Sequence, residues 1–123
     1  MSIVLVCDDE QVLRALVRAT LDEAGHEVVE ARDGDEALAQ ARAHGPAVIL
    51  LDMMMPGRSG IDVLAELRRD AALCETPVVM LSARTQLSDR ETALAAGADR
   101  YMPKPFSPLE LARVVEQLLE QAA

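Results

Sequence analysis

The sequence predicts an α/β fold, a doubly wound, five-stranded parallel sheet built as (βα)5. Two observations predict this class. Short runs typical of strands alternate with segments of helical periodicity along all 123 residues. Three of these runs are apolar throughout, as expected for strands buried on both faces of a parallel sheet. Because right-handed crossovers join parallel strands, helices should cover both faces of this sheet.

The strands differ in polarity, and this difference predicts their order. In chain order they are residues 3–7, 26–31, 47–51, 77–81 and 100–102. The first, third and fourth are wholly apolar and should be central, whereas the second, "HEVVEA", and the fifth, "RYM", contain polar side chains that suit the edges. The strand order 2-1-3-4-5 places all five strands in this way.

The first three helices are expected between these strands. Helix-spaced apolar residues from Leu13 to Ala24 form the first, and Gly25 ends it. An Ala-rich stretch, residues 36–44, forms the second and stops at Gly45. Ser59 is a good N-cap for the third, because its hydroxyl can accept a hydrogen bond from an unpaired N–H group of the first turn.

The last two helices differ in how amphipathic they are. Residues 86–96 have a helical but weakly amphipathic pattern, which Gly97 ends. Ser107 and Pro108 then begin a final helix with apolar residues at regular helical spacing. The fourth helix is therefore expected to be the least firmly anchored to the core.

Composition excludes several classes of protein. Asp and Glu together number 21 against 12 Lys and Arg, a net charge of −9, so direct binding to nucleic acid is not expected. Cys7 and Cys74 have the spacing of neither a disulfide framework nor a zinc site. The sequence contains no signal-peptide pattern and no membrane-length apolar segment. We expect a cytoplasmic chain without membrane contact.

The predicted strand order brings polar side chains together at one edge of the sheet. The residues at the carboxyl ends of strands 1, 3, 4 and 5 are Asp8, Asp9, Asp52, Ser82 and Lys104. Clustered carboxylates repel each other and should raise the pKa of at least one of them, unless they share a cation. Mg²⁺ accepts carboxylates, waters and phosphate oxygens as ligands. Lys104 and Ser82 can hold phosphoryl oxygens, so the site suits a phosphoryl group bridged to a metal, with Asp52 as nucleophile.

Four motifs carry a resemblance to a known family: "VLVCDDE", "VILLDMMMPGRSG", "PVVMLSA" and "GADRYMPKPF". Through them the chain resembles the receiver domain of two-component response regulators over essentially its whole length. The resemblance implies a single flavodoxin-like receiver domain over residues 1–123. It also implies that Asp52 accepts a phosphoryl group from the phosphohistidine of a histidine kinase or a histidine phosphotransfer protein.

The same resemblance implies roles for the other site residues. Asp9 and Asp52 would bind Mg²⁺ directly, with Mn²⁺ as a substitute, the Met54 backbone carbonyl as a third ligand and Asp8 acting through water. Met53 and Met55, on either side of Met54, are expected to pack at the strand end. The remaining roles concern the phosphoryl group and the turn after the last strand. Ser82 and Lys104 would bind phosphoryl oxygens, and the Lys104–Pro105 peptide bond would be cis.

By resemblance the chain is a phosphorylation-switched signalling domain rather than an enzyme, although it contributes to its own phosphorylation and dephosphorylation. Tyr101 would change rotamer when Ser82 moves toward the phosphoryl group. The signal would leave through the fourth helix, the fifth strand and the fifth helix. A partner protein, a fused output domain or a second copy in a phosphorylation-dependent homodimer would read it.

Two other classes fit the sequence less well. A haloacid-dehalogenase-type phosphatase needs a second Asp two residues after its nucleophile, where this chain has Met54. A flavodoxin-like nucleotide carrier would need a Gly- or Ser/Thr-rich phosphate loop after the first strand, where this chain has Asp8 and Asp9. The kinase and the pathway are not encoded in the sequence, nor is whether the domain works alone or within a longer protein.

Overall fold

A computed structural model describes residues 2–83 and 87–122 of the chain. In chain order the elements are β1 (Ile3–Cys7), α1 (Gln11–Glu23), β2 (Glu27–Ala31), α2 (Gly34–His44), β3 (Val48–Asp52), α3 (Gly60–Arg69), β4 (Val78–Ser82), α4 (Leu87–Ala95), β5 (Arg100–Pro103) and α5 (Pro108–Ala122). The strands form one parallel sheet in the order β2-β1-β3-β4-β5. The predicted fold class and strand order are confirmed, with the two more polar strands at the edges.

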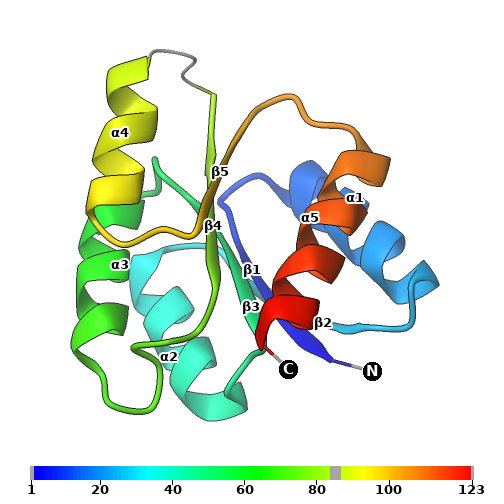
Figure 1. Cartoon of the computed structure of the whole chain (residues 1–123), viewed down its shortest axis with the longest axis horizontal. Coiled ribbons are helices and arrows are strands. Elements are labelled where there is room, and N and C mark those ends of the chain that lie inside the picture. The colour runs from blue at the N-terminus through cyan, green and yellow to red at the C-terminus, as the bar shows by residue number, and fades with distance from the viewer. Residues whose placement is uncertain (1, 84–86, 123) are drawn as a thin grey trace.

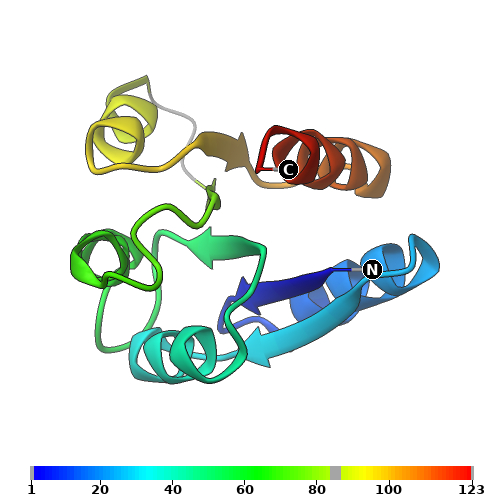
Figure 2. The same cartoon turned by 60° about the horizontal axis from the view of Figure 1, so that its bottom comes forward.

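Helices cover both faces of the sheet (Figure 1). The helices α1 and α5 lie on one face and α2, α3 and α4 on the other, and the turned view keeps the same two groups apart (Figure 2). Successive strand residues point to opposite faces, so the sheet divides the core into two apolar clusters. In β1, for example, Val4 and Val6 pack toward α1 and α5, whereas Leu5 and Cys7 pack toward α2 and α3. This two-sided burial explains why the central strands are apolar throughout.

Two central strands end one residue later than the sequence predicted, at Asp52 and Ser82. The ladder explains the difference, because Asp52 pairs with Leu81 and Ser82 pairs with Pro103 in register. Both polar residues therefore belong to the last rung of their strands. Their backbones are fixed by the sheet, which is a more rigid support than a loop.

Local signals set the helix ends. Ser59 caps α3 as predicted, since its side chain accepts a hydrogen bond from the Asp62 N–H at 3.2 Å. The helix α2 begins at Gly34, two residues before the predicted start, because the Asp33 side chain accepts the Glu36 N–H at 2.8 Å and caps the helix there. The predicted fourth helix, residues 86–96, is observed as α4 from Leu87, and residue 86 lies outside the described residues. As expected, α4 is weakly anchored: of its residues only Ala93 is buried.

Gly60 allows the start of α3 to approach the end of β3 closely. A Cβ atom at this position would lie 2.3 Å from the Asp52 carbonyl oxygen, a distance that no side chain tolerates. The Gly60 N–H also donates to the Met53 carbonyl at 3.0 Å. The connection from Met53 to Ser59 is thereby held against the strand end.

Within the described part of the chain, no helix has the length and apolar character needed to cross a membrane.

Candidate functional site

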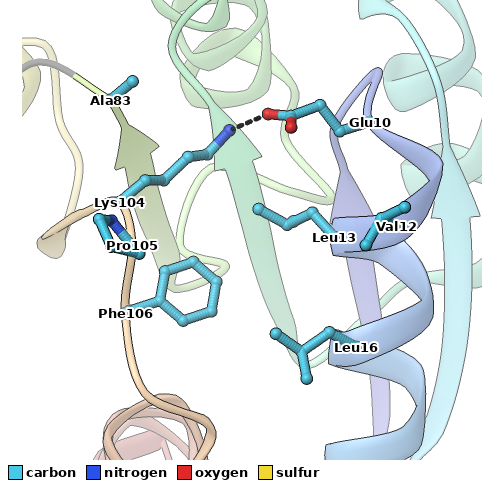
Figure 3. A pocket seen from close by; sticks show the side chains of 8 residues that line it. All are labelled: Glu10, Val12, Leu13, Leu16, Ala83, Lys104, Pro105 and Phe106. Atoms are coloured by element: carbon cyan, nitrogen blue, oxygen red, sulfur yellow. Dashed lines mark hydrogen bonds and ion pairs between the residues drawn. The ribbon is translucent and has the colours of Figure 1, made fainter.

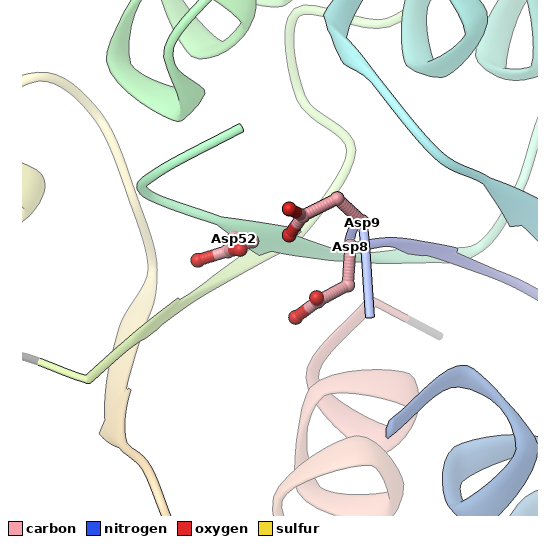
Figure 4. A group of neighbouring side chains, drawn as sticks. All are labelled: Asp8, Asp9 and Asp52. Atoms are coloured by element: carbon pink, nitrogen blue, oxygen red, sulfur yellow. The ribbon is translucent and has the colours of Figure 1, made fainter. Parts of the chain in front are cut away.

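Three carboxylates meet where β1 and β3 end (Figure 4). Asp8, Asp9 and Asp52 each offer one oxygen, and these oxygens all lie within 4.8 Å of one another. They come together because β1 and β3 are neighbours, with Cys7 and Leu51 in register. Asp8 and Asp52 are buried and Asp9 is exposed. The structure thus brings together the acidic residues that the sequence singled out.

Lys104 enters this cluster from the end of β5. Its Nζ lies 2.7 Å from Asp8 Oδ2, 3.5 Å from Asp52 Oδ2 and 3.4 Å from Glu10 Oε1. Burial alone would lower the pKa of Lys104, but the hydrogen bond to Asp8 and the nearby negative charges outweigh burial and raise it. The side chain is therefore a fixed positive charge at neutral pH. The Lys104–Pro105 peptide bond is cis, as expected.

Asp52 is the carboxylate with the most altered acidity. Burial, and secondarily the charge of Asp8, raise the pKa of Asp52 to about 6, although the Met54 N–H and Lys104 act in the opposite direction. The Met54 N–H donates to Asp52 Oδ1 at 3.2 Å. The predicted direction is confirmed, but burial is a larger cause than the repulsion on which the prediction rested. At neutral pH the group is still mostly ionised and can act as a nucleophile.

Ser82 and Tyr101 lie on the neighbouring strands β4 and β5. Ser82 is fully buried, and its carbonyl oxygen accepts the Lys104 N–H at 2.7 Å. Tyr101 is half-buried and packs against the apolar cluster that faces α2 and α3. Because Met80 and Tyr101 are in register and Ser82 follows two residues after Met80, Ser82 and Tyr101 point to the same face of the sheet.

The methionines that follow Asp52 are arranged as the sequence suggested. Met53 and Met55 are buried in the core, while Met54 is 56% exposed beside the site. The role of the Met54 backbone carbonyl as a metal ligand stays a prediction.

Two residues in contact with the site were not singled out from the sequence. Glu10 reaches Lys104, and Arg14 Nη1 donates to the Asp8 carbonyl oxygen at 2.7 Å. Arg14 had a detectable signal, because it stands at helical spacing with Val17 and Leu21 on the buried face of α1. An arginine in that position requires a polar partner in the interior.

An apolar pocket of about 410 Å³ opens next to Lys104, between α1 and the start of the connection to α5 (Figure 3). Its apolar walls include Val12, Leu16 and Phe106, and its polar rim is formed by Glu10 and Lys104. Val12 is 83% exposed and Leu16 is 41% exposed. The site therefore borders a surface on which apolar side chains are accessible to a partner.

The donor atoms of the cluster fit a hard divalent cation. All three ligand candidates are carboxylates, and such oxygen donors suit Mg²⁺ rather than a thiophilic metal. Two of the three are buried close together, and this arrangement is costly without a positive charge among them. Lys104 supplies one such charge on the side of Asp8.

Comparisons with known proteins agree with this arrangement. The sequence model of the response regulator receiver domain family matches residues 4–116. Over 118 residues the chain is 42% identical to the phosphate regulon transcriptional regulatory protein PhoB of Escherichia coli, a match that covers 96% of this chain and 52% of PhoB. It is 41% identical to the transcriptional regulatory protein ResD of Bacillus subtilis, over 98% of this chain and 49% of ResD. The chain thus spans about half the length of these curated relatives.

Solved structures of response regulator and chemotaxis proteins have the same fold as this chain. The receiver domain of the Francisella response regulator 1452 superposes with a TM-score of 0.94 and 34% identity, over 100% of both chains. The chemotaxis protein CheY4 of Vibrio cholerae superposes with a TM-score of 0.90 and 35% identity, over 96% of this chain and 98% of that one.

Proposed function

The chain belongs to the response regulator receiver domain family, and we propose that Asp52 is the residue on which it accepts a phosphoryl group. Receiver domains are phosphorylation-switched signalling domains of two-component systems. The observation that carries the assignment is the position of Asp52 at the end of β3, where it lies beside the other two carboxylates and 3.5 Å from Lys104 Nζ. We extend the proposal to residues 1–123 as one receiver domain.

The donor chemistry follows from the nucleophile. An Asp52 carboxylate oxygen attacks the phosphorus of a phosphohistidine, an O–P bond forms, and the N–P bond breaks with its electron pair left on the imidazole. Lys104 Nζ, which lies 3.5 Å from Asp52 Oδ2, would hold a phosphoryl oxygen, and the Ser82 hydroxyl would donate to another. In this sense the chain contributes to its own phosphorylation and, with water as the attacking group, to its dephosphorylation.

The acidic cluster has a second role in the proposal. Asp9 and Asp52 would hold Mg²⁺ or Mn²⁺ directly, with Asp8 acting through water and the Met54 carbonyl as a further ligand. The bound cation supplies positive charge that offsets the carboxylates and the incoming phosphoryl oxygens.

The partner that supplies the phosphoryl group is proposed to be a histidine kinase or a histidine phosphotransfer protein, in the cytoplasm. The apolar pocket beside Lys104 supports a protein donor, because it offers Val12 and Leu16 as exposed contact residues near Lys104, which in turn contacts Asp52. Direct nucleic-acid contact is not part of the proposal, since the chain has a net charge of −9.

On the output side, we propose that the face made by α4, β5 and α5 carries the signal. It would be read by a partner protein, by an output domain fused to the chain or by a second copy in a phosphorylation-dependent homodimer. The two relatives described above are transcriptional regulators about twice as long as this chain, which supports a fused output domain.

Phosphorylation with a small donor tests the central assignment. Wild-type protein and the Asp52→Asn variant are incubated with acetyl phosphate and Mg²⁺, and the modified residue is located by mass spectrometry. One phosphoryl group should appear on Asp52 in the wild type, and none in the variant or in the presence of EDTA. A label of equal amount in Asp52→Asn would refute the assignment. Independently, millimolar Mg²⁺ should raise the melting temperature of the wild type, because only the folded state gathers the ligands.

A further inference from the structure

Arg14 is the one buried basic residue in the described part of the chain, among four buried polar or charged residues. The other three, Asp8, Asp52 and Ser82, belong to the site. Arg14 lies on the face of α1 that packs against the sheet, and 7% of it is exposed. A buried guanidinium costs free energy unless its donors are satisfied, so the partners that satisfy it define what it does.

Arg14 joins the site to the edge strand of the sheet. Its Nη1 donates to the Asp8 carbonyl oxygen at 2.7 Å, and its Nε donates to Glu30 Oε1 at 3.0 Å. Glu30 belongs to β2, and Arg18 holds its second oxygen with an Nη2–Oε2 distance of 2.7 Å. Burial alone would raise the pKa of Glu30, but hydrogen bonds and charges from Arg18 and Arg14 outweigh it and lower the pKa. Glu30 is therefore an ionised anchor for the Arg14 guanidinium at neutral pH.

The contact with Asp8 fixes a particular peptide group. The Asp8 N–H donates to the Ala31 carbonyl at 3.0 Å, so the amide side of Asp8 is held by the sheet. On its other side, the Asp8 carbonyl and the Asp9 N–H share one planar peptide unit. Because Arg14 holds this carbonyl, it sets the orientation of that plane and hence the direction in which the Asp9 side chain leaves the backbone. Asp9 is the exposed member of the cluster, so its backbone is the main constraint on where its carboxylate lies.

We propose that Arg14, anchored by Glu30, is a positioning residue for cation binding: it orients the Asp8–Asp9 peptide so that both carboxylates face the cation. This inference rests on the proposed function, because it requires that the cluster binds Mg²⁺. Residues that hold metal ligands in place commonly change metal affinity by about 10- to 100-fold when they are removed. A loss of that size is therefore expected without any change to the ligands themselves.

The chain offers a matched control in Arg18. Arg14→Met and Arg18→Met each remove one positive charge and one partner of Glu30, but only Arg14→Met releases the Asp8 carbonyl. If these arginines acted through charge alone, both variants would bind Mg²⁺ more tightly, since a nearby positive charge repels a cation. A positioning role predicts that one of the two variants binds Mg²⁺ more weakly instead. Arg14→Met should weaken Mg²⁺ binding by about tenfold or more, while Arg18→Met should bind as well as the wild type or better.

Mg²⁺ titration by calorimetry at constant ionic strength measures these affinities, with urea unfolding as a check that each variant is folded. Arg14→Lys and Arg18→Lys form a second matched pair in case Arg14→Met does not fold. A lysine ammonium cannot reproduce the fork that reaches both Asp8 and Glu30, so Arg14→Lys should bind Mg²⁺ more weakly than Arg18→Lys. Equal affinities within both pairs would overturn the positioning role. A wild type that binds no Mg²⁺ would overturn the metal site itself and this inference with it, so the two failures can be told apart.

Discussion

Lys104 lies closer to Asp8 than to Asp52, the proposed phosphoryl acceptor. Its Nζ is 2.7 Å from Asp8 Oδ2 and 3.5 Å from Asp52 Oδ2. A phosphoryl group on Asp52 would add negative charge on that side. Lys104 is therefore expected to move its closest contact from Asp8 to the phosphorylated Asp52. Asp8 therefore influences the acceptor in two ways, through its own charge and through its hold on Lys104.

Replacing Asp8 with Asn should lower the pKa of Asp52. The negative charge of Asp8 is the second largest cause, after burial, of the raised pKa of about 6. Its removal also weakens the contact between Lys104 and residue 8, so that Lys104 is free to interact more strongly with Asp52. Carboxyl carbon chemical shifts of the metal-free protein, followed over a pH titration, give the midpoint directly. Asp9→Asn is the control, because Asp9 is exposed and is not a cause of the shift. An unchanged midpoint in Asp8→Asn would mean that burial alone sets the acidity of Asp52.

The raised pKa of Asp52 also predicts how stability depends on pH. The value is 3.8 for a free Asp and about 6 in the folded, metal-free protein. Between these values the folded state keeps a proton that the unfolded chain has released, so stability falls as the pH rises through this window and stays reduced above it. At about 1.4 kcal/mol per pKa unit, the total effect is at most about 3 kcal/mol.

Asp52→Asn isolates this contribution, because the amide cannot ionise. The variant should be more stable than the wild type by up to about 3 kcal/mol above pH 6, and the difference should shrink toward zero near pH 4. Urea unfolding without divalent metal, at several pH values, measures the difference. Titrating groups that are not in contact with Asp52 are common to both proteins and cancel. A difference that does not vary with pH would contradict the raised pKa.

Transfer from a protein donor should depend on the pocket beside Lys104, whereas transfer from a small donor should not. Val12 and Leu16 are exposed on α1 and face this pocket (Figure 3). Leu16→Asp places a charge on the apolar contact surface without touching Asp52. The rate of transfer from a phosphohistidine protein should then fall by about tenfold or more. Losing an apolar contact residue of a protein interface commonly costs about 1.4 kcal/mol or more of binding free energy, which corresponds to that factor. The rate with acetyl phosphate should stay near that of the wild type. The same substitution at Leu109, exposed on α5 away from this pocket, is the control.

Arg68 joins three segments on the α3 and α4 side of the sheet. Its guanidinium donates to the carbonyl oxygens of Gly97, Thr76 and Cys74, with Nη2 2.7 Å from Gly97 O and Nη1 2.8 Å from Thr76 O. It also pairs with Asp99, with an Nη2–Oδ2 distance of 3.1 Å. These contacts tie the end of α3 to the turn before β4 and to the turn before β5.

Removing Arg68 should cost more stability than an ordinary surface substitution. Arg68→Ala leaves backbone carbonyl groups in partly buried surroundings without their partner, and a loss of about 2–4 kcal/mol is expected. The neighbouring Arg69 is exposed, so Arg69→Ala should change the free energy of unfolding by less than about 0.5 kcal/mol. Urea unfolding of both variants at one pH measures the difference. Equal effects would show that the Arg68 contacts do not contribute.

The fold was predictable because the signals that determine it are local. Apolar runs mark the buried strands, and the polar residues that end them, such as Asp52 and Ser82, reveal the edge at which a site forms. Contacts that depend on tertiary packing were not predictable. The partner of Arg14 lies 16 residues away on another element, and the acceptors of Arg68 are backbone carbonyls, which have no sequence signature. The size of the burial effect on Asp52 likewise depends on how neighbouring elements cover it.

The signal is expected to leave the site through Tyr101 and α4. Ser82 and Tyr101 share one face of the sheet on adjacent strands, two rungs apart, and the neighbouring α4 has only Ala93 buried among its residues. Movement of the Ser82 hydroxyl toward a phosphoryl group should therefore shift Tyr101 and α4 rather than the more firmly packed α2. Beryllofluoride with Mg²⁺ mimics the phosphorylated carboxylate, and amide chemical shifts follow the response. Large changes are expected at Tyr101 and across Leu87–Ala95, and Ser82→Ala should reduce them while the changes next to Asp52 persist. Asp52→Asn with the same additives is the control and should show no change at α4. If only the residues around Asp52 respond in the wild type, the proposed output face is wrong.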